Sequence, residues 1–381
     1  MLFDAGLEVM IWNLKLLAAF GFKPFFYDRE KNKFIRRDQD NRLKIIITSG
    51  TVAALVVNGI HTITFSQGLT STKKAFIGTI VLGFWTGCTV AMPVLSGCQR
   101  YVDMLNMMGF FESEYFKLLG CTSNCVRWWK FRVQLCNLEA TIVSFVVPVT
   151  GFAILVYEPK IPTFLGSVSV NMESSCIHLI VFAVSFVLQG NIFCVVPVSF
   201  CIMVGSMCCG TSICMAGYLS CLKKSAKCAN NLAMSVNLYK QPSVLVAQMN
   251  LSFRQMVLPT ILMYSISANI LGSYLCVKLN SQLFSNVRNI LFPLLALETF
   301  LLIMGLGTTA GLTNKTSMRI VRKMKVAFLK DNMGNTGYVR GMINSCSPMR
   351  IRFGSNFIEM STPLVITSFC VKFLVRLLLL V

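Results

Sequence analysis

"TSFCVKFLVRLLLLV", residues 367–381, reads as a membrane helix, yet it contains Lys372 and Arg376. Extended back to residue 363, the run holds thirteen Leu, Val, Ile or Phe residues. Each of these favours insertion by about 0.3 to 0.6 kcal/mol at a helix centre, whereas each central cation costs about 2.5 to 3.5 kcal/mol. The two sums nearly cancel, so this helix requires a face that is wet or covered by protein.

The whole chain has the composition of a membrane protein. Of its 381 residues, 55% are apolar and only 13% are charged, about half the usual charged share of a soluble domain. The net charge of +20 comes from cations that fall between apolar runs, which argues against a nucleic-acid-binding face. The sixteen cysteines lie mostly in apolar runs or in loops expected in the cytosol, where thiols stay reduced. We therefore expect no metal, no other cofactor and no nucleic acid.

Seven apolar runs are long enough to cross a hydrocarbon core, which takes about 20 helical residues. They are residues 43–65, 75–97, 140–158, 178–208, 255–277, 289–311 and 363–381. Proline inside several of them argues for helices, because membrane helices tolerate it and strands do not. The expected fold class is an all-α membrane protein with seven transmembrane helices, and residues 1–381 form a single domain. The fourth run is the longest and is expected to continue as a helix beyond the bilayer.

The distribution of Lys and Arg predicts the orientation. Alternate connections between the spans hold 28 of these cations on one side and 5 on the other. Positively charged segments stay in the cytosol, so the N-terminus is expected inside and the C-terminus outside, in the plasma membrane. The cytosolic connections are long, and we expect 209–254 and 312–362 to form a helical anchor there. The alternative is that such basic stretches lie as separate helices on anionic lipid.

Two further stretches resemble the arthropod chemoreceptor superfamily of gustatory and odorant receptors. "WNLKLLAAFGFKPFFYDREKNKF" (12–34) is similar to the lead-in to that family's first span, and "MINSCSPMRIRFGSNFIEMSTPLVITSFC" (342–370) to the segment before and into its seventh. Of the gustatory signature in the last span, only Thr367 matches. Ser368 stands where the family has tyrosine, so the gustatory and odorant branches both stay open.

The resemblance implies a function. Members of this superfamily are ligand-gated, non-selective cation channels built as tetramers, with the seventh helices around one pore and a cytosolic anchor between subunits. The implied partners are a small organic ligand, membrane lipids and either identical subunits or a co-receptor. A transporter and a G-protein-coupled receptor remain alternatives, the second with reversed orientation. No arrangement of nucleophile, base or paired carboxylates predicts an enzyme.

Helical spacing predicts which residues of the last span line the pore. A polar stripe recurs at multiples of about 3.6 residues, with threonines beside it. The pore-lining candidates are Thr367, Ser368, Lys372 and Arg376. Arg376 is close enough to the outer end to snorkel to the headgroups instead. Lys372 is near the midplane, and it either faces the pore or pairs with Glu298, the one carboxylate deep in a span.

Aromatic residues in the outer halves of the second, third, fourth and sixth spans predict a ligand pocket. Aromatic walls with one or two polar groups suit a small, mostly apolar ligand. The candidates are Phe84, Trp85, Phe152, Tyr157, Phe182, Phe186, Gln189 and Phe292. "GLGTTAG" (305–311) in the sixth span is not a phosphate-binding loop, because no Lys-Ser/Thr follows it and no strand precedes it. Its small residues instead predict a close helix–helix approach.

Overall fold

The computed structural model describes residues 2–37, 41–66, 68–115, 123–157, 164–165, 176–225, 232–280, 289, 291–330 and 336–380. The helices are α1 (Asp4–Ala19), α2 (Arg42–Phe65), α3 (Ser71–Leu95), α4 (Gln99–Glu114), α5 (Ser123–Tyr157), α6 (Cys176–Cys201), the π-helix η3 (Ile202–Gly210), α7 (Thr211–Ser225), α8 (Leu232–Phe253), α9 (Val257–Lys278), α10 (Leu291–Lys330), α11 (Thr336–Asn344) and α12 (Thr362–Leu380). Two antiparallel hairpins join β1 (Phe25–Asp28) to β2 (Lys33–Arg36) and β3 (Arg352–Phe353) to β4 (Asn356–Phe357).

The seven predicted spans are confirmed as helices. Within the described residues, seven helices are long and apolar enough to cross a membrane: α2, α3, α5, the continuous α6–η3–α7 helix, α9, α10 and α12. A helix satisfies every backbone hydrogen bond within one segment, which is the requirement that hydrocarbon imposes on a single span. The predicted continuation of the fourth run is also confirmed, because one unbroken helix runs from Leu179 to Lys223.

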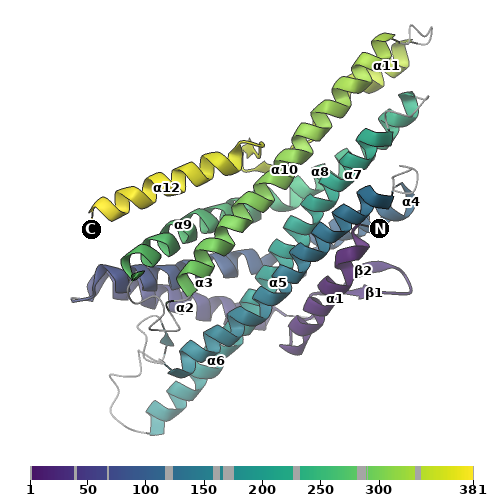
Figure 1. Cartoon of the computed structure of the whole chain (residues 1–381). Coiled ribbons are helices and arrows are strands. Elements are labelled where there is room, and N and C mark those ends of the chain that lie inside the picture. Colours follow the sequence, from purple (N-terminus) through teal and green to yellow (C-terminus); the bar gives the residue numbers. More distant parts are fainter. Residues whose placement is uncertain are drawn as a thin grey trace.

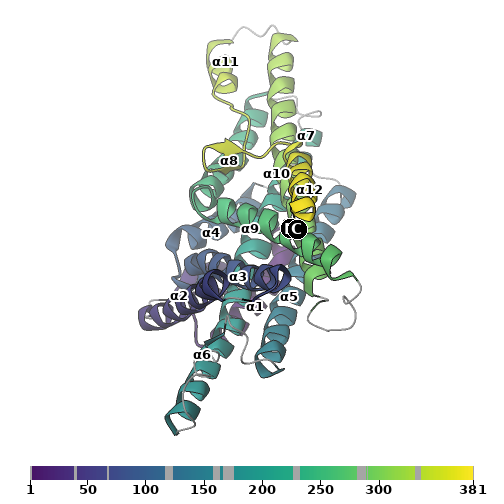
Figure 2. The same cartoon turned by 90° about the vertical axis from the view of Figure 1, so that its left-hand side faces the viewer.

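The molecule is elongated, and its two ends differ (Figure 1, Figure 2). At one end α7, α8, α11 and the C-terminal part of α10 project together, and we call this part the helical extension. The N-terminus lies on the side of the extension, and α12 carries the C-terminus away from it (Figure 1). The basic stretches 126–140 and 314–330, for which separate helices on the lipid surface were the alternative, instead belong to membrane-length helices, α5 and α10.

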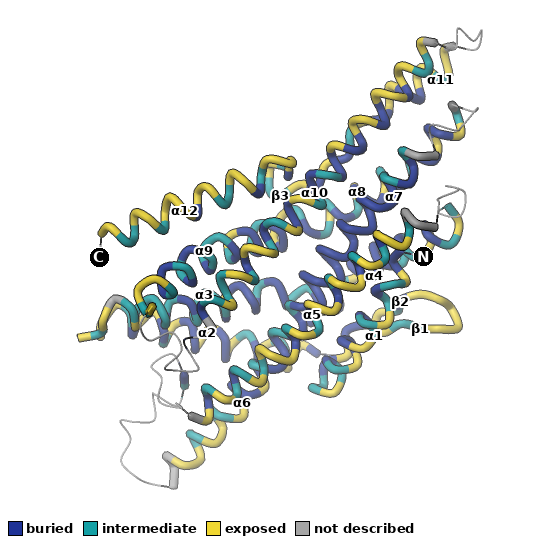
Figure 3. The backbone as a smooth tube through the Cα atoms, in the orientation of Figure 1, coloured by how far each residue is buried: buried dark blue, intermediate teal, exposed yellow. Residues whose placement is uncertain are grey.

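The largest core cluster lies toward the extension. It joins α1, the β1–β2 hairpin, α4, η3, α7 and α8, and every residue of η3 is buried (Figure 3). Buried polar groups there bind one another. The Glu112 carboxylate accepts the backbone N–H of Phe3 at 2.6 Å and the Tyr218 hydroxyl at 2.8 Å, which ties the start of the chain to α4 and α7. Burial raises the pKa of Glu112, although these two hydrogen bonds oppose the rise.

Toward the other end, the buried clusters of the described residues are smaller, and one of them has Leu155 and Phe164 as its buried members. The α5–α6 crossing there is close because each helix places a phenylalanine against a glycine of the other. The Phe193 ring lies against Gly151, and the Phe152 ring is about 3 Å from where a Cβ on Gly190 would be. Among the described residues, the largest core cluster therefore lies toward the extension, and smaller clusters join the helices at the other end.

The "GLGTTAG" stretch is confirmed as a close contact. The start of α12 and the residues before it lie directly on α10 there. A Cβ on Gly311 would be 2.7 Å from the backbone of Glu359 and Met360, and Pro363 lies against Gly307. Gly305, on the same helix, has open space around it. This contact fixes where the last helix begins.

The contact predicts opposite effects for the same substitution at two positions. Gly305→Ala should leave the protein as stable or add up to about 1 kcal/mol, the difference in helix propensity. Gly311→Ala should cost about 1–3 kcal/mol, because backbone atoms rather than a flexible side chain must move. Thermal unfolding of the two purified variants in the same detergent measures the difference. Equal midpoints would show that the backbone does not pass over Gly311 this closely.

Candidate functional site

Aromatic side chains from α3, α5 and α6 meet at the end of the bundle away from the extension. Phe84 of α3 is buried with Ile192 and Val196 of α6, and its ring lies 5.4 Å from the Phe193 ring. Phe193 also packs against Leu155 and Phe164, and Phe76 and Phe186 pack against the same two residues. We call Phe76, Phe84, Phe164, Phe186 and Phe193 the aromatic cluster. It offers apolar walls contributed by separate helices.

Gln189 is the polar group beside this cluster. It stands three residues after Phe186 and four before Phe193, so all three lie on one face of α6. The side chain is buried, and its Nε2 donates to the Ser185 carbonyl at 3.1 Å. Its Oε1 is buried and has no hydrogen-bond partner among the described residues. A buried acceptor without a partner lowers the stability of the fold by about 1–3 kcal/mol. The Gln189 Oε1 is therefore well suited to a ligand that donates a hydrogen bond.

The other ligand-binding candidates lie around the cluster rather than in it. Trp85 is 59% exposed, because consecutive residues on a helix point about 100° apart and Phe84 takes the inward direction. Phe152 is half-buried over Gly190. Phe182 is half-buried, with its ring 6.4 Å from that of Phe186. The Tyr157 side chain lies outside the part of the chain that the structure describes.

Phe292 connects this region to the last helix. It is buried with Tyr274 and Leu275 of α9, and its ring meets the Phe76 ring edge-on at 5.7 Å. The residues of α12 that pack against this group are Leu374, Leu377 and Leu378. Phe76 belongs to both groups, so side chains in continuous contact lead from the aromatic cluster to α12.

Three members of the cluster were not predicted from the sequence: Phe76, Phe164 and Phe193. Phe164 lies between the predicted third and fourth spans, whereas helical spacing could have found Phe76 and Phe193. Phe76 precedes Phe84 by two turns, with Ile80 between them, and Phe193 follows Gln189 by one turn. On each helix, the residue that was not predicted shares a face with one that was: Phe76 with Phe84 on α3, and Phe193 with Gln189 on α6.

The last helix packs on the bundle with one narrow face. Pro363 and Cys370 are its buried residues, and the opposite face is exposed along its length (Figure 3). Of the predicted pore-lining residues, Thr367 is half-buried on the packed side, where its hydroxyl donates to the Pro363 carbonyl at 2.8 Å. Ser368, Lys372 and Arg376 all lie on the exposed face. These three residues share an exposed face that also carries Val365, Val375 and Leu379, and Thr367 lies at its edge. That this face lines a pore stays a prediction.

The structure does not bring Lys372 and Glu298 together. No ion pair joins them, although both side chains belong to the described residues. Glu298 is half-buried on another face of α10, close enough to Glu139 of α5 to interact with it electrostatically. It interacts in the same way with Cys201 and Tyr264. Within one subunit the two cations of α12 are not neutralised by this carboxylate.

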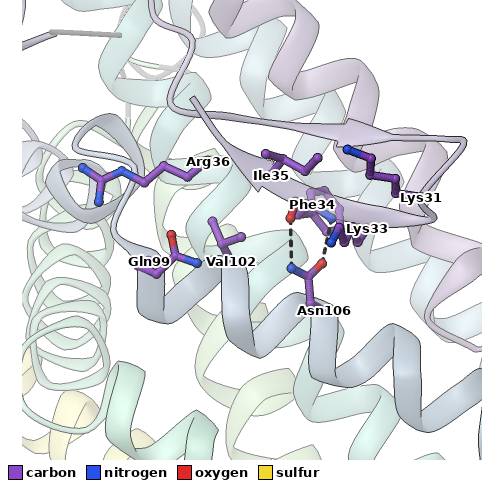
Figure 4. Close-up of a pocket in the computed structure, with 8 residues that line it drawn as sticks. All are labelled: Lys31, Lys33, Phe34, Ile35, Arg36, Gln99, Val102 and Asn106. Atoms are coloured by element: carbon purple, nitrogen blue, oxygen red, sulfur yellow. Dashed lines mark hydrogen bonds between the residues drawn. The ribbon is translucent and has the colours of Figure 1, made fainter. Parts of the chain in front are cut away.

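A basic pocket of about 590 Å³ lies beside the β1–β2 hairpin (Figure 4). It is lined by Lys31, Lys33, Phe34, Ile35, Arg36, Gln99, Val102 and Asn106. The Asn106 side chain accepts the Phe34 N–H at 2.7 Å and donates to the Phe34 carbonyl at 2.9 Å, which holds the hairpin on α4. Both groups of the Asn106 amide are hydrogen-bonded to Phe34, so the pocket lies where the β1–β2 hairpin is attached to α4. No group of three or more His, Cys, Asp or Glu side chains among the described residues could hold a metal.

The fold has solved counterparts. Over 100% of both chains, with a TM-score of 0.69 and 14% identity, it is similar to the insect olfactory receptor OR5 from Machilis hrabei in complex with eugenol. The chain has the insect olfactory receptor fold. A second structure of the same receptor is similar with a TM-score of 0.68 and 14% identity, over 98% of this chain and 99% of the other. No protein-family model and no curated protein matches the sequence.

The olfactory receptor fold thus confirms the all-α, seven-transmembrane architecture expected from the sequence. It also agrees with the resemblance of residues 12–34 and 342–370 to the chemoreceptor superfamily. At 14% identity the likeness concerns the path of the chain, so residue roles must come from this structure. The candidate functional features of this structure are the aromatic cluster, Gln189 and the exposed face of α12.

The Gln189 Oε1 predicts an unusual stability effect. Gln189→Leu should raise the unfolding temperature of the ligand-free protein by a few degrees, because it removes a buried acceptor that has no hydrogen-bond partner among the described residues. Asn269→Leu is the matched control. The Asn269 amide donates to the Ala296 carbonyl at 2.9 Å, so its loss should lower the unfolding temperature. If Gln189→Leu destabilised the protein as much as Asn269→Leu, the Gln189 Oε1 would have a partner.

Proposed function

We propose that the chain is a subunit of a chemosensory receptor that is itself a ligand-gated ion channel of the plasma membrane. A small organic molecule binds at the aromatic cluster, and α12 lines the pore. The observation that carries this proposal is the exposed polar face of α12 in a chain with the insect olfactory receptor fold. A helix with two cations on its open face needs water or protein there, and a central pore between subunits supplies both.

Exposed apolar residues on the helical extension support assembly. Met318, Val326 and Leu329 of α10 and Tyr338 of α11 are all exposed, and Leu329 and Tyr338 are at least three-quarters so. By the orientation that the cation count predicts, these residues lie in the cytosol, where no lipid covers them. Such residues mark contacts with another protein. The extension, within 209–254 and 312–362, therefore joins subunits into a tetramer, either of identical chains or with a co-receptor.

The proposed ligand is small, mostly apolar and able to donate one hydrogen bond. The walls of the aromatic cluster exclude water, and the Gln189 Oε1 beside them lacks a donor among the described residues. Volatile phenols fit this description, and the similar receptor from Machilis hrabei is in complex with one of them, eugenol. Eugenol is accordingly the first probe for this chain. The affinity of such a ligand comes from the burial of its apolar surface and from a hydrogen bond to the Gln189 Oε1.

Gating then follows from the contacts between the cluster and the last helix. A ligand that displaces Phe186 or Phe193 acts on Phe76, which touches Phe292 and through it α12. A ligand shifts the closed–open equilibrium only by its difference in affinity for the two states. The small clusters at this end of the bundle make such a rearrangement possible, because few buried contacts must change.

The proposal predicts that Phe186→Ala weakens the response to ligand. Removing the ring deletes contact area worth about 1.5–3 kcal/mol, which shifts the half-maximal concentration by roughly tenfold or more. Trp85→Ala is the control, because Trp85 points away from the cluster. Currents are recorded against eugenol and a panel of volatile phenols at matched surface expression. A larger loss in Trp85→Ala than in Phe186→Ala would move the ligand site to the outside of α3.

The path to α12 predicts a different defect for Phe76→Ala. Truncation breaks the contact between the aromatic cluster and Phe292, so the maximal current should fall several-fold while ligand binding is largely kept. Binding is measured as the ligand-induced rise in unfolding temperature, and opening as the maximal current. Phe300→Ala, an exposed phenylalanine on α10, should change neither. Equal losses of binding and current in Phe76→Ala would place Phe76 in the binding site and not between the site and the pore.

A further inference from the structure

The charges on the exposed face of α12 all have one sign. Lys372 and Arg376 are exposed, and between residues 332 and 381 the only side-chain carboxylate is Glu359, which precedes the helix. Glu359 lies where the chain crosses α10 at Gly311. The middle and the far half of the helix therefore carry positive charge without a nearby negative group from the same segment.

Lys372 lies near the middle of α12, and Arg376 lies closer to its C-terminal end. Lys372 stands ten residues into α12, about 15 Å at 1.5 Å per residue, which is near the middle of the helix. Arg376 follows one turn later, about 6 Å further along the axis. Ser368 precedes Lys372 by one turn on the same exposed face, so the polar groups form a continuous line. The Arg376 guanidinium lies 5.8 Å from the Phe373 ring, which leaves its charge in place.

Within the part of the chain that the structure describes, neither cation is in an ion pair. Glu298 faces α5 and α9 instead of α12. Charges at such a position without counter-ions require a face in contact with water. Mobile anions in that water can then act as partners of these cations.

We propose that Lys372 and Arg376 make the pore select small anions over monovalent cations. This rests on the channel function proposed above, in which copies of α12 surround one axis with their exposed faces inward. Each subunit then contributes to two rings of positive charge one helical turn apart. Rings of charged side chains set selectivity in pores, and basic rings favour anions. Cation conduction is the part of the chemoreceptor resemblance that these residues oppose.

The reversal potential of the current tests this directly. The full chain is expressed alone, and current through it is recorded under an asymmetric KCl gradient, both spontaneously and with eugenol. In the parent the reversal potential should lie near the chloride equilibrium potential. In the double variant Lys372→Gln/Arg376→Gln the ratio of chloride to potassium permeability should fall by roughly tenfold or more. Lys372→Arg, which keeps the charge, should behave as the parent.

Lys278→Gln is the matched control. It removes the same charge from the exposed last turn of α9, outside the proposed pore, and should leave the reversal potential unchanged. A parent that reverses near the potassium potential, with no shift in the double variant, would overturn the selectivity assignment and leave the channel intact. Protein at the surface that passes no current with or without ligand would instead contradict a channel built from this chain alone, on which the selectivity assignment rests.

Discussion

Two cations in the middle of an apolar helix cannot face hydrocarbon without a cost that nearly cancels the insertion energy of that helix. In this chain they lie on the side of α12 that the rest of the subunit does not cover, so one subunit alone leaves them exposed. In the proposed channel, assembly around a water-filled axis keeps these cations in contact with water. Exposed apolar residues of the helical extension then supply a surface for contacts between subunits. The close contact of Gly311 with the backbone of Glu359 and Met360 fixes where α12 begins.

The distribution of packing suits a receptor whose two ends have different tasks. Every residue of η3 is buried, and the buried Glu112 and Tyr218 nearby are hydrogen-bonded to each other. Among the described residues, the clusters at the other end are smaller, and the Gln189 Oε1 there is one of several buried polar atoms of the chain without a hydrogen-bond partner. A region with few buried contacts opens at lower free energy than a dense core. In the function proposed above, ligand binding there moves side chains that reach α12, and the extension joins the subunits.

Hydropathy predicted the seven spans correctly because the bilayer imposes a length and a composition on every crossing segment. The helical spacing of Ser368, Lys372 and Arg376 predicted the polar face of α12 for a similar reason, since an α-helix has a fixed period. Contacts between helices were harder to predict. Because Phe84 points into the bundle, its neighbour Trp85 points away from the aromatic cluster. Whether Lys372 could reach Glu298 depended on the rotation of α10 about its axis, which hydropathy does not encode. The β1–β2 hairpin, held by Asn106 of α4, depends on a contact between segments 72 residues apart and was not predicted.

The central claim is that the exposed face of α12 lines a water-filled axis between subunits. An electron cryomicroscopy structure of the full chain in lipid nanodiscs tests it most directly. We predict four copies joined through the helical extension, with Ser368, Lys372 and Arg376 of each pointing at the common axis and solvent density along it. A particle in which this face of α12 contacts lipid, or in which the subunits meet through α2 and leave α12 at the periphery, would contradict the account.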